Sequence, residues 1–482
     1  MLWIVFLVGV AASKPLQNES ISLYQTAQNT TDRITLKGNV SFEPDFKFST
    51  SITVNRSAKY QEMLGFGGAF TESSAYVWST LNATVQQRLL DLYFSKEGLQ
   101  YSLGRIPIGS CDFALAWYSY DEVRDDANLT HFTVSHEKKW RIPFIRAAIE
   151  SRSNWTTAPF KFVASPWSPP KWMKTNDFPY CPTSCFDCQL KAEYRDTYAM
   201  YMSKFITAFD ELGVPTWAVT VQNEPEACPL LYAGMHFNPE TERDFVRDHL
   251  GPRLANDHPA VKILAYDHNK DHVAKWAKVI YADAAAARYV WGTAVHWYTG
   301  DEFENVNATH YLAPDKPILA TEATVAREKD PRAPAWENGE HYAHDMIGDF
   351  NNWVVGFIDW NLVLDMYGGP DHAGPAECEG LIKCGSDAMI LADNSTQELY
   401  LQIFYYYMGH FSKFVSPGSV RVGVSASTND LESTAFVTPA NETVVIVLNR
   451  QDSATTYKLL DRLSGKAARI TVPAHSIQTL VY

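Results

Sequence analysis

The sequence predicts an α/β protein built on a (β/α)8 TIM barrel, with an additional antiparallel β-sandwich domain assembled from both chain termini. Three observations predict this fold. Eight short apolar runs alternate with stretches of helical periodicity between residues 65 and 361, and these runs are nearly continuous rather than alternating. Both flanks of this region instead show the two-residue alternation and turn residues typical of antiparallel sheets.

The eight predicted strands end repeatedly in polar or aromatic residues. They cover residues 65–70, 101–109, 160–165, 217–223, 262–267, 294–298, 317–322 and 355–361. Helical periodicity lies between them, for example at residues 85–94, 142–152, 194–211, 240–256 and 341–353. Strand–helix alternation with buried strands indicates a parallel sheet, and eight such units close naturally into a barrel.

The flanks predict the second domain. Residues 442–449, which read Glu-Thr-Val-Val-Ile-Val-Leu-Asn, follow a Pro-Ala-Asn turn and precede a polar stretch, as a strand in a hairpin would. We therefore expect residues 61–408 to form the barrel. Residues 30–60 and 409–482 should pair with each other in the β-sandwich.

The amino-terminal residues and the sequons indicate export. Residues 1–13 form an apolar run followed by small residues, which predicts a signal peptide; a buried amphiphilic start is the alternative, because the run has no Lys or Arg before it. No later segment reaches the roughly 18 apolar residues that a membrane span needs. Ten Asn-x-Ser/Thr sequons predict N-glycosylation at several sites. They are Asn18, Asn29, Asn39, Asn55, Asn82, Asn128, Asn154, Asn307, Asn394 and Asn441.

The composition is that of an acidic globular protein. The 482 residues are 46% hydrophobic and 20% charged, with a formal net charge of −14. A chain with this charge lacks the basic surface that neutralises phosphates, which excludes nucleic-acid binding as a function class. The sequence pI of about 5.5 suits an acidic compartment.

Seven cysteines leave at least one thiol without an intramolecular partner. Three of them crowd one loop with C-x3-C-x2-C spacing, which could suggest zinc, but no His follows at ligand spacing and an exported chain favours disulfides. Cys111 is the residue we expect to stay free. The candidates for three bridges, whose connectivity stays open, are Cys181, Cys185, Cys188, Cys228, Cys378 and Cys384.

Two glutamates end predicted strands in frames that suggest chemistry. Glu224 follows the fourth strand in an Asn-Glu-Pro tripeptide, and Glu322 ends the seventh. Active sites of such barrels lie at the C-terminal ends of the strands. Retaining glycoside hydrolysis needs an acid and a nucleophilic carboxylate roughly 5 Å apart, whereas a single glutamate at a strand end is more often a salt-bridge or capping partner. In this frame Asn223 could bind a sugar 2-hydroxyl while Glu224 reaches the glycosidic oxygen.

Six segments in order make the chain resemble the glucosylceramidases, which are retaining (β/α)8-barrel glycoside hydrolases. The resemblance runs from about residue 48 to residue 482. The segments are GFGGAFTE at 65–72, SCDF at 110–113, ASPWSPPKWMKTN at 164–176, AVHWY at 294–298, DWN at 359–361 and GHFSKF at 409–414.

The resemblance implies roles for eight residues. Glu224 would be the acid/base and Glu322 the nucleophile. A glucose-binding shell would comprise Asp112, Trp167, Asn223 and Trp360, with His296 and Tyr298 beside the nucleophile. Each has chemistry suited to the role, because carboxylates accept from sugar hydroxyls and indoles supply apolar faces together with an N–H donor.

The sequence departs from the family pattern in three places. The cysteine-paired extreme N-terminus of the vertebrate enzymes is absent, and the loop after Asn176 carries three cysteines instead. Residues 327–334 are charged where the family usually places an entrance aromatic, for which Trp336 is a doubtful substitute. Residues 368–378 do not align onto the family's late sugar-binding Asn. These departures leave the aglycone open.

The resemblance implies hydrolysis of glucosylceramide in the lysosome through a covalent glycosyl-enzyme, without a metal or another cofactor. Implied partners are the lysosomal membrane surface and a saposin-type activator. Two alternatives stay open: a secreted β-glycosidase acting on a xyloside, galactoside or sterol glucoside, and a non-catalytic glycan-binding relative. The second alternative should have lost one of the two carboxylates, and this chain has both.

Overall fold

Eight parallel strands close into a barrel in the computed structural model of the protein, which describes residues 20–326, 332, 335–372 and 386–482. Each strand pairs in parallel with its neighbours, and β12 closes the ring on β5. The predicted barrel is therefore confirmed. The strands are β5 (Gly65–Ala69), β6 (Leu103–Ile108), β7 (Lys161–Pro166), β8 (Thr216–Thr220), β9 (Lys262–Asn269), β10 (Val290–His296), β11 (Ile318–Glu322) and β12 (Val354–Asn361).

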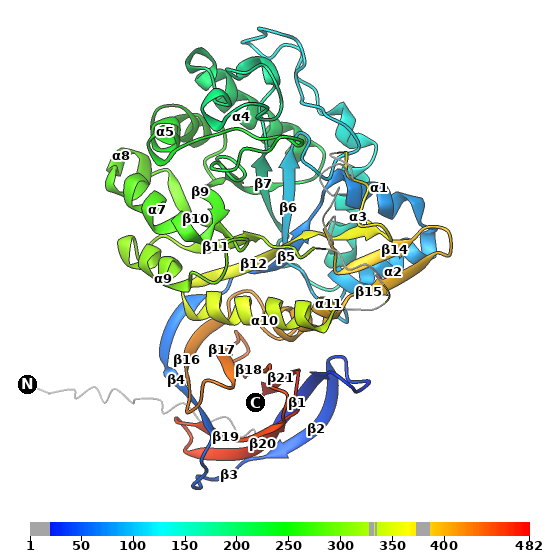
Figure 1. Ribbon diagram of the computed structural model, residues 1–482, viewed down its shortest axis with the longest axis vertical. Helices are drawn as coiled ribbons and strands as arrows, with labels where there is room; N and C mark the ends of the chain where they lie inside the picture. The colour runs from blue at the N-terminus through cyan, green and yellow to red at the C-terminus, as the bar shows by residue number, and fades with distance from the viewer. Residues whose placement is uncertain (1–19, 327–331, 333–334, 373–385) are drawn as a thin grey trace, which may run out of the picture.

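Helices follow every barrel strand and surround the barrel (Figure 1). Polar caps begin the first two, because the Thr71 hydroxyl accepts from the Ser74 N–H and the Asn82 side chain accepts from the Val85 N–H. The long helix predicted after the fourth strand is continuous but contains a π-helical turn at Val246–Leu250. The helices are α1 (Glu72–Thr80), α2 (Ala83–Phe94), α3 (Arg141–Ser153), α4 (Arg195–Glu211), α5 (Pro239–Phe245), α6 (Gly251–Asp257), α7 (Val273–Ala282), α8 (Ala284–Ala287), α9 (Phe303–Leu312), α10 (Trp336–Asn351) and α11 (Ile403–Ser412).

The barrel interior is layered, and this layering positions the polar residues. Aliphatic side chains from every strand except β5 fill the lower part of the barrel. Because side chains alternate along a strand, residues two positions further on point into the next layer up. Arg105 follows Leu103 in this way on β6, and Thr321 follows Leu319 on β11. The C-terminal end of the barrel therefore receives the polar side chains.

A ten-stranded sheet made from both ends of the chain lies beside the barrel, below helices α10 and α11 in Figure 1. Its strand order is β2-β1-β21-β18-β17-β16-β4-β19-β20-β3, and only the β4–β19 pair is parallel. The predicted second domain of mostly antiparallel strands from the two termini is confirmed. Its strands are β1 (Ser20–Ala27), β2 (Thr35–Ser41), β3 (Glu43–Pro44), β4 (Ser51–Glu62), β16 (Val420–Ala426), β17 (Glu432–Val437), β18 (Thr443–Asn449), β19 (Thr455–Asp461), β20 (Lys466–Val472) and β21 (Ser476–Val481).

Helices α10 and α11 lie between the barrel and this sheet (Figure 1). His410 of α11 is fully buried there, and its two ring nitrogens lie 2.9 Å from the Thr26 hydroxyl of β1 and 2.8 Å from the Thr479 hydroxyl of β21. One side chain thus joins the barrel to strands from both ends of the chain. A small sheet of β13 (Val363–Asp365), β14 (Ile390–Asp393) and β15 (Glu398–Leu401) follows β12.

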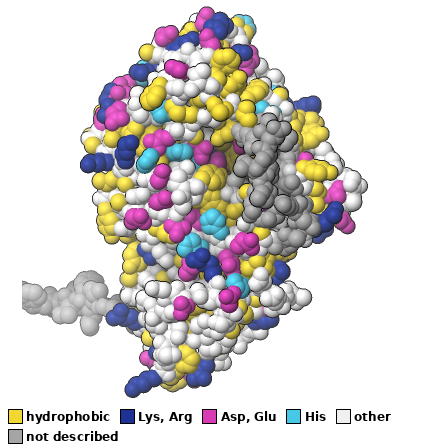
Figure 2. Space-filling model, in the orientation of Figure 1, with side chains coloured by type: hydrophobic (Ala, Val, Ile, Leu, Met, Phe, Trp, Pro, Cys, Tyr) yellow, Lys and Arg dark blue, Asp and Glu magenta, His cyan; other side chains and the backbone are white. Residues whose placement is uncertain are grey.

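The surface carries acidic and basic side chains interspersed with apolar ones on the face shown in Figure 2. Within the described ranges, none of the helices combines the length and apolar character required to cross a membrane.

Candidate active site

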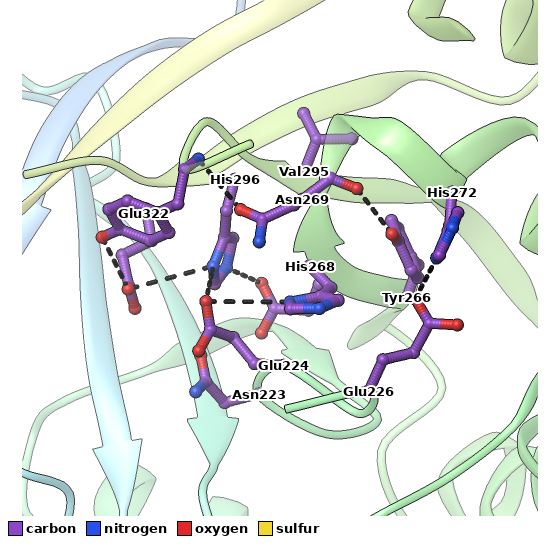
Figure 3. A network of polar contacts seen from close by, with 12 residues as sticks. Asn223, Glu224, Glu226, Tyr266, His268, Asn269, His272, Val295, His296 and Glu322 are labelled. Carbon is purple, nitrogen blue, oxygen red and sulfur yellow. Dashed lines mark hydrogen bonds and ion pairs between the residues drawn. The ribbon is translucent and has the colours of Figure 1, made fainter. Parts of the chain in front are cut away.

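Glu224 and Glu322 converge at the C-terminal end of the barrel. Glu322 is the last residue of β11, and Glu224 lies in the turn that follows β8. One carboxylate oxygen of each and one ring nitrogen of His296 lie within 4.8 Å of one another (Figure 3). The two glutamate side chains are only 14% and 8% exposed. The structure therefore brings the two predicted carboxylates together in one largely desolvated place.

A cavity of about 380 Å³ opens above these carboxylates. Seven of the eight predicted site residues line it: Asp112, Trp167, Asn223, Glu224, Tyr298, Glu322 and Trp360. The eighth, His296, is buried beside them. The two indoles stack on each other, with ring centroids 5.2 Å apart and an interplanar angle of 27°. The cavity thus combines an aromatic wall with carboxylate and amide groups.

Glu322 is held by groups that favour a carboxylate. The Tyr298 hydroxyl donates to its Oε1 over 2.9 Å, and an Arg105 guanidinium nitrogen lies 3.5 Å from Oε2. Burial nevertheless raises the pKa of Glu322, against the positive charges of His296 and Arg105, and the negative charge of Glu224 raises it further.

Glu224 is surrounded by imidazoles. The Nδ1 atoms of His296 and His268 lie 3.2 Å and 3.7 Å from its Oε1, and Figure 3 shows its carboxyl facing both rings. Although burial opposes it, these two imidazoles lower the pKa of Glu224 to about 2. Two carboxyls this close titrate as a pair. In the unliganded protein the imidazoles therefore draw the negative charge of the pair toward Glu224.

Asp112 is the other carboxyl of the cavity, and burial together with nearby carboxylates raises its pKa well above the usual range. Its Oδ1 atom is buried without a hydrogen-bond partner among the described residues. Such an acceptor is available to a ligand hydroxyl.

Asp267 connects the groups that hold the carboxylates, and the sequence did not single it out. It accepts two hydrogen bonds from Arg105, at 2.9 and 3.0 Å, one from Thr321 at 2.6 Å, and lies 3.0 Å from His296 Nε2. The guanidinium and imidazole hold the pKa of Asp267 far below its usual range, despite burial. Conversely, the surrounding carboxylates overcome burial and raise the pKa of His296 to about 9.

A bulge in β9 places Asp267 and its neighbour. Ala294 of β10 pairs with Tyr266 and Val295 pairs with His268, so that Asp267 is an extra residue in the ladder. Tyr266 and Asp267 have φ angles of 76° and 59°, and Glu224 has a φ of 45°. The Glu224 N–H donates to the Asp267 carbonyl over 2.9 Å. Backbone in this region is strained for residues other than glycine, and such strain clusters at functional sites.

The cysteines of the loop after Asn176 form disulfides in the structure. Cys181 pairs with Cys188 and Cys185 with Cys228, while Cys111 is buried and free. The loop therefore holds disulfides and not the zinc site that was the alternative. Cys378 and Cys384 lie outside the described residues. Trp336 is buried against Tyr407, with ring centroids 5.7 Å apart, rather than placed at the cavity.

In the part of the chain that the structure describes, two clusters have the spacing of metal ligands. One contains the disulfide-bonded Cys185 and Cys228, whose sulfurs are already used. The other is the Glu224, His296 and Glu322 group, where the Arg105 guanidinium already supplies a positive charge 3.5 Å from Glu322. Neither cluster resembles a site built for a cation.

Comparison with known proteins decides the family. The glycosyl hydrolase family 30 TIM-barrel domain matches residues 63–415, and the family's beta sandwich domain matches residues 418–480. The chain belongs to glycosyl hydrolase family 30. Its enzymes are glycosidases, and the two matched domains correspond to the barrel and to the carboxyl-terminal strands of the ten-stranded sheet.

Family 30 relatives cover nearly the whole chain. Lysosomal acid glucosylceramidase from Mus musculus is 35% identical over 448 residues, which are 89% of this chain and 83% of that protein. The structure of SrfJ from Salmonella typhimurium is 32% identical, with a TM-score of 0.86 over 96% of this chain and 99% of that one. The endo-β1,6-glucanase BT3312 is 28% identical, with a TM-score of 0.82 over the same shares of the two chains. The family 30 fold therefore hosts more than one glycosidase specificity.

Proposed function

We propose that this family 30 glycosidase is a retaining β-glucosidase that hydrolyses glucosylceramide to glucose and ceramide, with Glu322 as nucleophile and Glu224 as acid/base. The observation that carries the proposal is the approach of the two carboxylates, whose nearest oxygens lie within 4.8 Å. Carboxyl groups of retaining enzymes are about 5 Å apart, whereas inverting enzymes separate them by roughly 6.5–9.5 Å to admit a water molecule.

The nucleophilic step follows from the contacts of Glu322. Tyr298 and Arg105 orient its carboxylate, and the anomeric carbon of a sugar in the cavity would be attacked from that side while Glu224 protonates the departing oxygen. In the second step Glu224 removes a proton from a water molecule. The water oxygen attacks the anomeric carbon, and the bond from that carbon to Glu322 breaks. Both steps balance without a cofactor.

The sugar-binding groups have defined directions. Arg105 donates to Asn223 Oδ1 over 2.7 Å, which leaves the amide N–H groups of Asn223 to donate to a sugar hydroxyl. The stacked indoles of Trp167 and Trp360 offer an apolar face and N–H donors at the cavity wall. Asp112 would accept from a hydroxyl at its buried Oδ1.

Two relatives support different substrates. The choice of glucosylceramide rests on the mouse glucosylceramidase, which has the higher identity. The second candidate is a secreted β-glycosidase acting on another glycan, and BT3312, named as an endo-β1,6-glucanase, favours it.

Lysosomal or secreted localisation is part of the proposal. It is supported by the name of the mouse relative and by two disulfides in the described chain. Surface exposure of the sequons also supports glycosylation during export, because seven of the nine described sequon asparagines are exposed: Asn29, Asn39, Asn82, Asn128, Asn154, Asn394 and Asn441. The proposed partners are a membrane surface that presents the glycolipid and a saposin-type activator.

The test is a comparison of substrates at pH 5. Purified enzyme would be assayed on glucosylceramide in mixed micelles, galactosylceramide, an aryl β-xyloside and a β1,6-glucan. We expect kcat/KM on glucosylceramide to exceed that on the other three by at least an order of magnitude, since pockets that hydrogen-bond a hydroxyl discriminate strongly against its loss or inversion. Preferential cleavage of the glucan would establish the second candidate instead.

A further inference from the structure

Among the residues that the structure describes, His268 is the one imidazole that lines the cavity without belonging to the predicted site. Its side chain lines the cavity and is 12% exposed, and its Nδ1 lies 3.7 Å from Glu224 Oε1. This nitrogen is buried and has no hydrogen-bond partner among the described residues. The distance is too long for a hydrogen bond but well within electrostatic reach.

The bulge in β9 is what aims His268 at the cavity. Ala265 and Tyr266 both pack in the outer core, where the Tyr266 ring lies 5.1 Å from that of Trp276 on α7. Asp267 then reaches Arg105 inside the barrel, and His268 lines the cavity. Two consecutive side chains on the cavity side are incompatible with regular alternation, and a bulge permits them.

The same bulge fixes the other partner. The Asp267 carbonyl accepts from the N–H of Glu224, whose backbone is in the left-handed region. Asp267, whose φ is also positive, therefore holds both residues: its carbonyl accepts from the Glu224 N–H, and His268 follows it in the chain. Their separation is set by the backbone and not by two flexible side chains.

The titratable groups around this pair come from the ends of β6, β8, β10 and β11. Glu224 faces His296 of β10, Glu322 of β11, Tyr298 after β10 and Asp112 after β6. His268 faces Glu224 and, from the same turn, Glu226.

We propose that His268 is a positioning residue for Glu224: held by the bulge, its imidazole favours the ionised form of this carboxyl and so decides where the proton of the carboxyl pair resides before substrate binds. This inference rests on the proposed acid/base role of Glu224. His296 cannot fill the same role alone, because its two nitrogens are shared between Glu224, Asp267 and Glu322.

The consequence is a cost in the active protonation state. Turnover needs a proton on Glu224 and none on Glu322, and His268 disfavours that arrangement in the unliganded protein. It favours the ionised Glu224 that acts as base in the second step. His268 thus disfavours the protonated Glu224 needed for the first step and favours the ionised Glu224 needed for the second.

The test is the pH profile of kcat/KM for an alkyl β-glucoside, whose leaving group needs protonation. Replacing the imidazole by a neutral amide in His268→Asn should raise the pKa of Glu224 and move the alkaline limb upward by about one pH unit, as expected for loss of a group 4–6 Å away. His268→Lys, which places an ammonium group at this position, should leave the limb near its wild-type position. His268→Gln is the second neutral variant if His268→Asn does not fold.

His272 provides the matched control. Its Nδ1 lies 2.8 Å from Glu226, its side chain is 51% exposed, and it makes no contact with Glu224. His272→Asn should leave the limb unmoved. With a 2,4-dinitrophenyl β-glucoside, whose leaving group needs no protonation, the alkaline limb of kcat/KM should not shift in any variant.

An alkaline limb that stays in place in both neutral variants would overturn the inference, as would an equal shift in His268→Lys or His272→Asn. Failure of the proposed function looks different. In that case Glu224→Gln would retain wild-type activity on the alkyl glucoside, or the wild-type enzyme would hydrolyse neither glucoside.

Discussion

Glu224 and Glu322 share a cavity but have different neighbours, and these neighbours separate their roles. Glu322 contacts the Tyr298 hydroxyl and the Arg105 guanidinium, which would orient it as the proposed nucleophile. Glu224 instead lies beside two imidazoles, with the Nδ1 atoms of His296 and His268 3.2 Å and 3.7 Å from its Oε1. Loss of either carboxyl should lower activity, so the proposed roles must be distinguished by the product that forms.

Azide rescue distinguishes them. In Glu224→Ala the nucleophile remains, so a dinitrophenyl β-glucoside should still form the glycosyl-enzyme, and azide should release β-glucosyl azide. In Glu322→Ala azide should attack the substrate from the vacated face and give α-glucosyl azide by a single inversion. Proton NMR of the two products measures this. A β product from Glu322→Ala would reverse the assignment.

The second prediction at the residue scale concerns the contribution of Arg105 to stability. It donates two hydrogen bonds to Asp267 and both side chains are fully buried. Arg105→Gln leaves a buried carboxylate without its positive partner, which should cost about 3–5 kcal/mol of unfolding free energy. Arg105→Lys should cost less, because the charge remains while the paired geometry is lost. Urea unfolding checks both, and equal stability of Arg105→Gln and wild type would contradict a stabilising Arg105–Asp267 pair.

At the scale of elements, the two disulfides belong to the loops around the cavity. Cys185–Cys228 joins the loop after β7 to the turn after β8, four residues beyond Glu224, whereas Cys181–Cys188 closes a short segment within one loop. Their sequence separations are 43 and 7 residues. The longer link therefore constrains the turn that carries the proposed acid/base.

Removing the disulfides should separate these effects. From loop-closure entropy alone, we expect Cys185→Ala/Cys228→Ala to cost about 4 kcal/mol and Cys181→Ala/Cys188→Ala about 2 kcal/mol. The first double variant should also lower kcat/KM, because it frees the turn that bears Glu224. Thermal unfolding and kinetics on an aryl glucoside check this. A larger loss from the shorter link would refute the entropic account.

The sequence predicted elements better than it predicted their irregularities. Continuous apolar runs revealed the barrel strands, and polar residues at strand ends pointed to Glu224 and Glu322. Arg105 escaped because it lies within an apolar run, two residues above Leu103 in the barrel. The sequence did not identify Asp267 and His268 as site residues, because a bulge leaves no signal in hydrophobic periodicity. Regular alternation would place only one of two adjacent residues on the cavity side.

Sheet order was also beyond local reasoning. Turn residues predict hairpins such as β19–β20, but nothing in the local sequence indicates that β4 pairs in parallel with β19, more than 390 residues away. Likewise, β1 was not among the predicted strands, and its place between β2 and β21 depends on partners from the other end of the chain. Such pairings depend on tertiary packing.

At the scale of the whole molecule, we expect His410 to make the stability of the contact between barrel and sheet depend on pH. Burial lowers the pKa of His410 to about 3, below the usual value near 6.5. A histidine whose pKa is lowered by folding contributes stability above its unfolded pKa, and this contribution is lost as the pH falls from 6.5 toward 3. Acidification to pH 5 should therefore remove about 2 kcal/mol through this one residue.

His410→Gln isolates that contribution, because glutamine keeps hydrogen-bonding groups near Thr26 and Thr479 without titrating. The difference in unfolding free energy between wild type and variant should become less favourable to wild type by about 2 kcal/mol between pH 7 and pH 5. Urea unfolding at the two pH values measures it. A pH-independent difference would contradict the lowered pKa of His410, because it requires the same pKa in the folded and unfolded protein.

The sheet built from distant segments has a consequence for synthesis. Strands β1, β2 and β4 emerge first, but β21, which separates β1 from β18, emerges only after the whole barrel has been made. At roughly 5–20 residues per second, the early strands wait tens of seconds or more with unpaired edges. Sequons at Asn29, Asn39 and Asn55 lie in or beside these strands. Sugars added there during translocation would cover the unpaired edges of these strands until their partner strands, such as β21, have been synthesised.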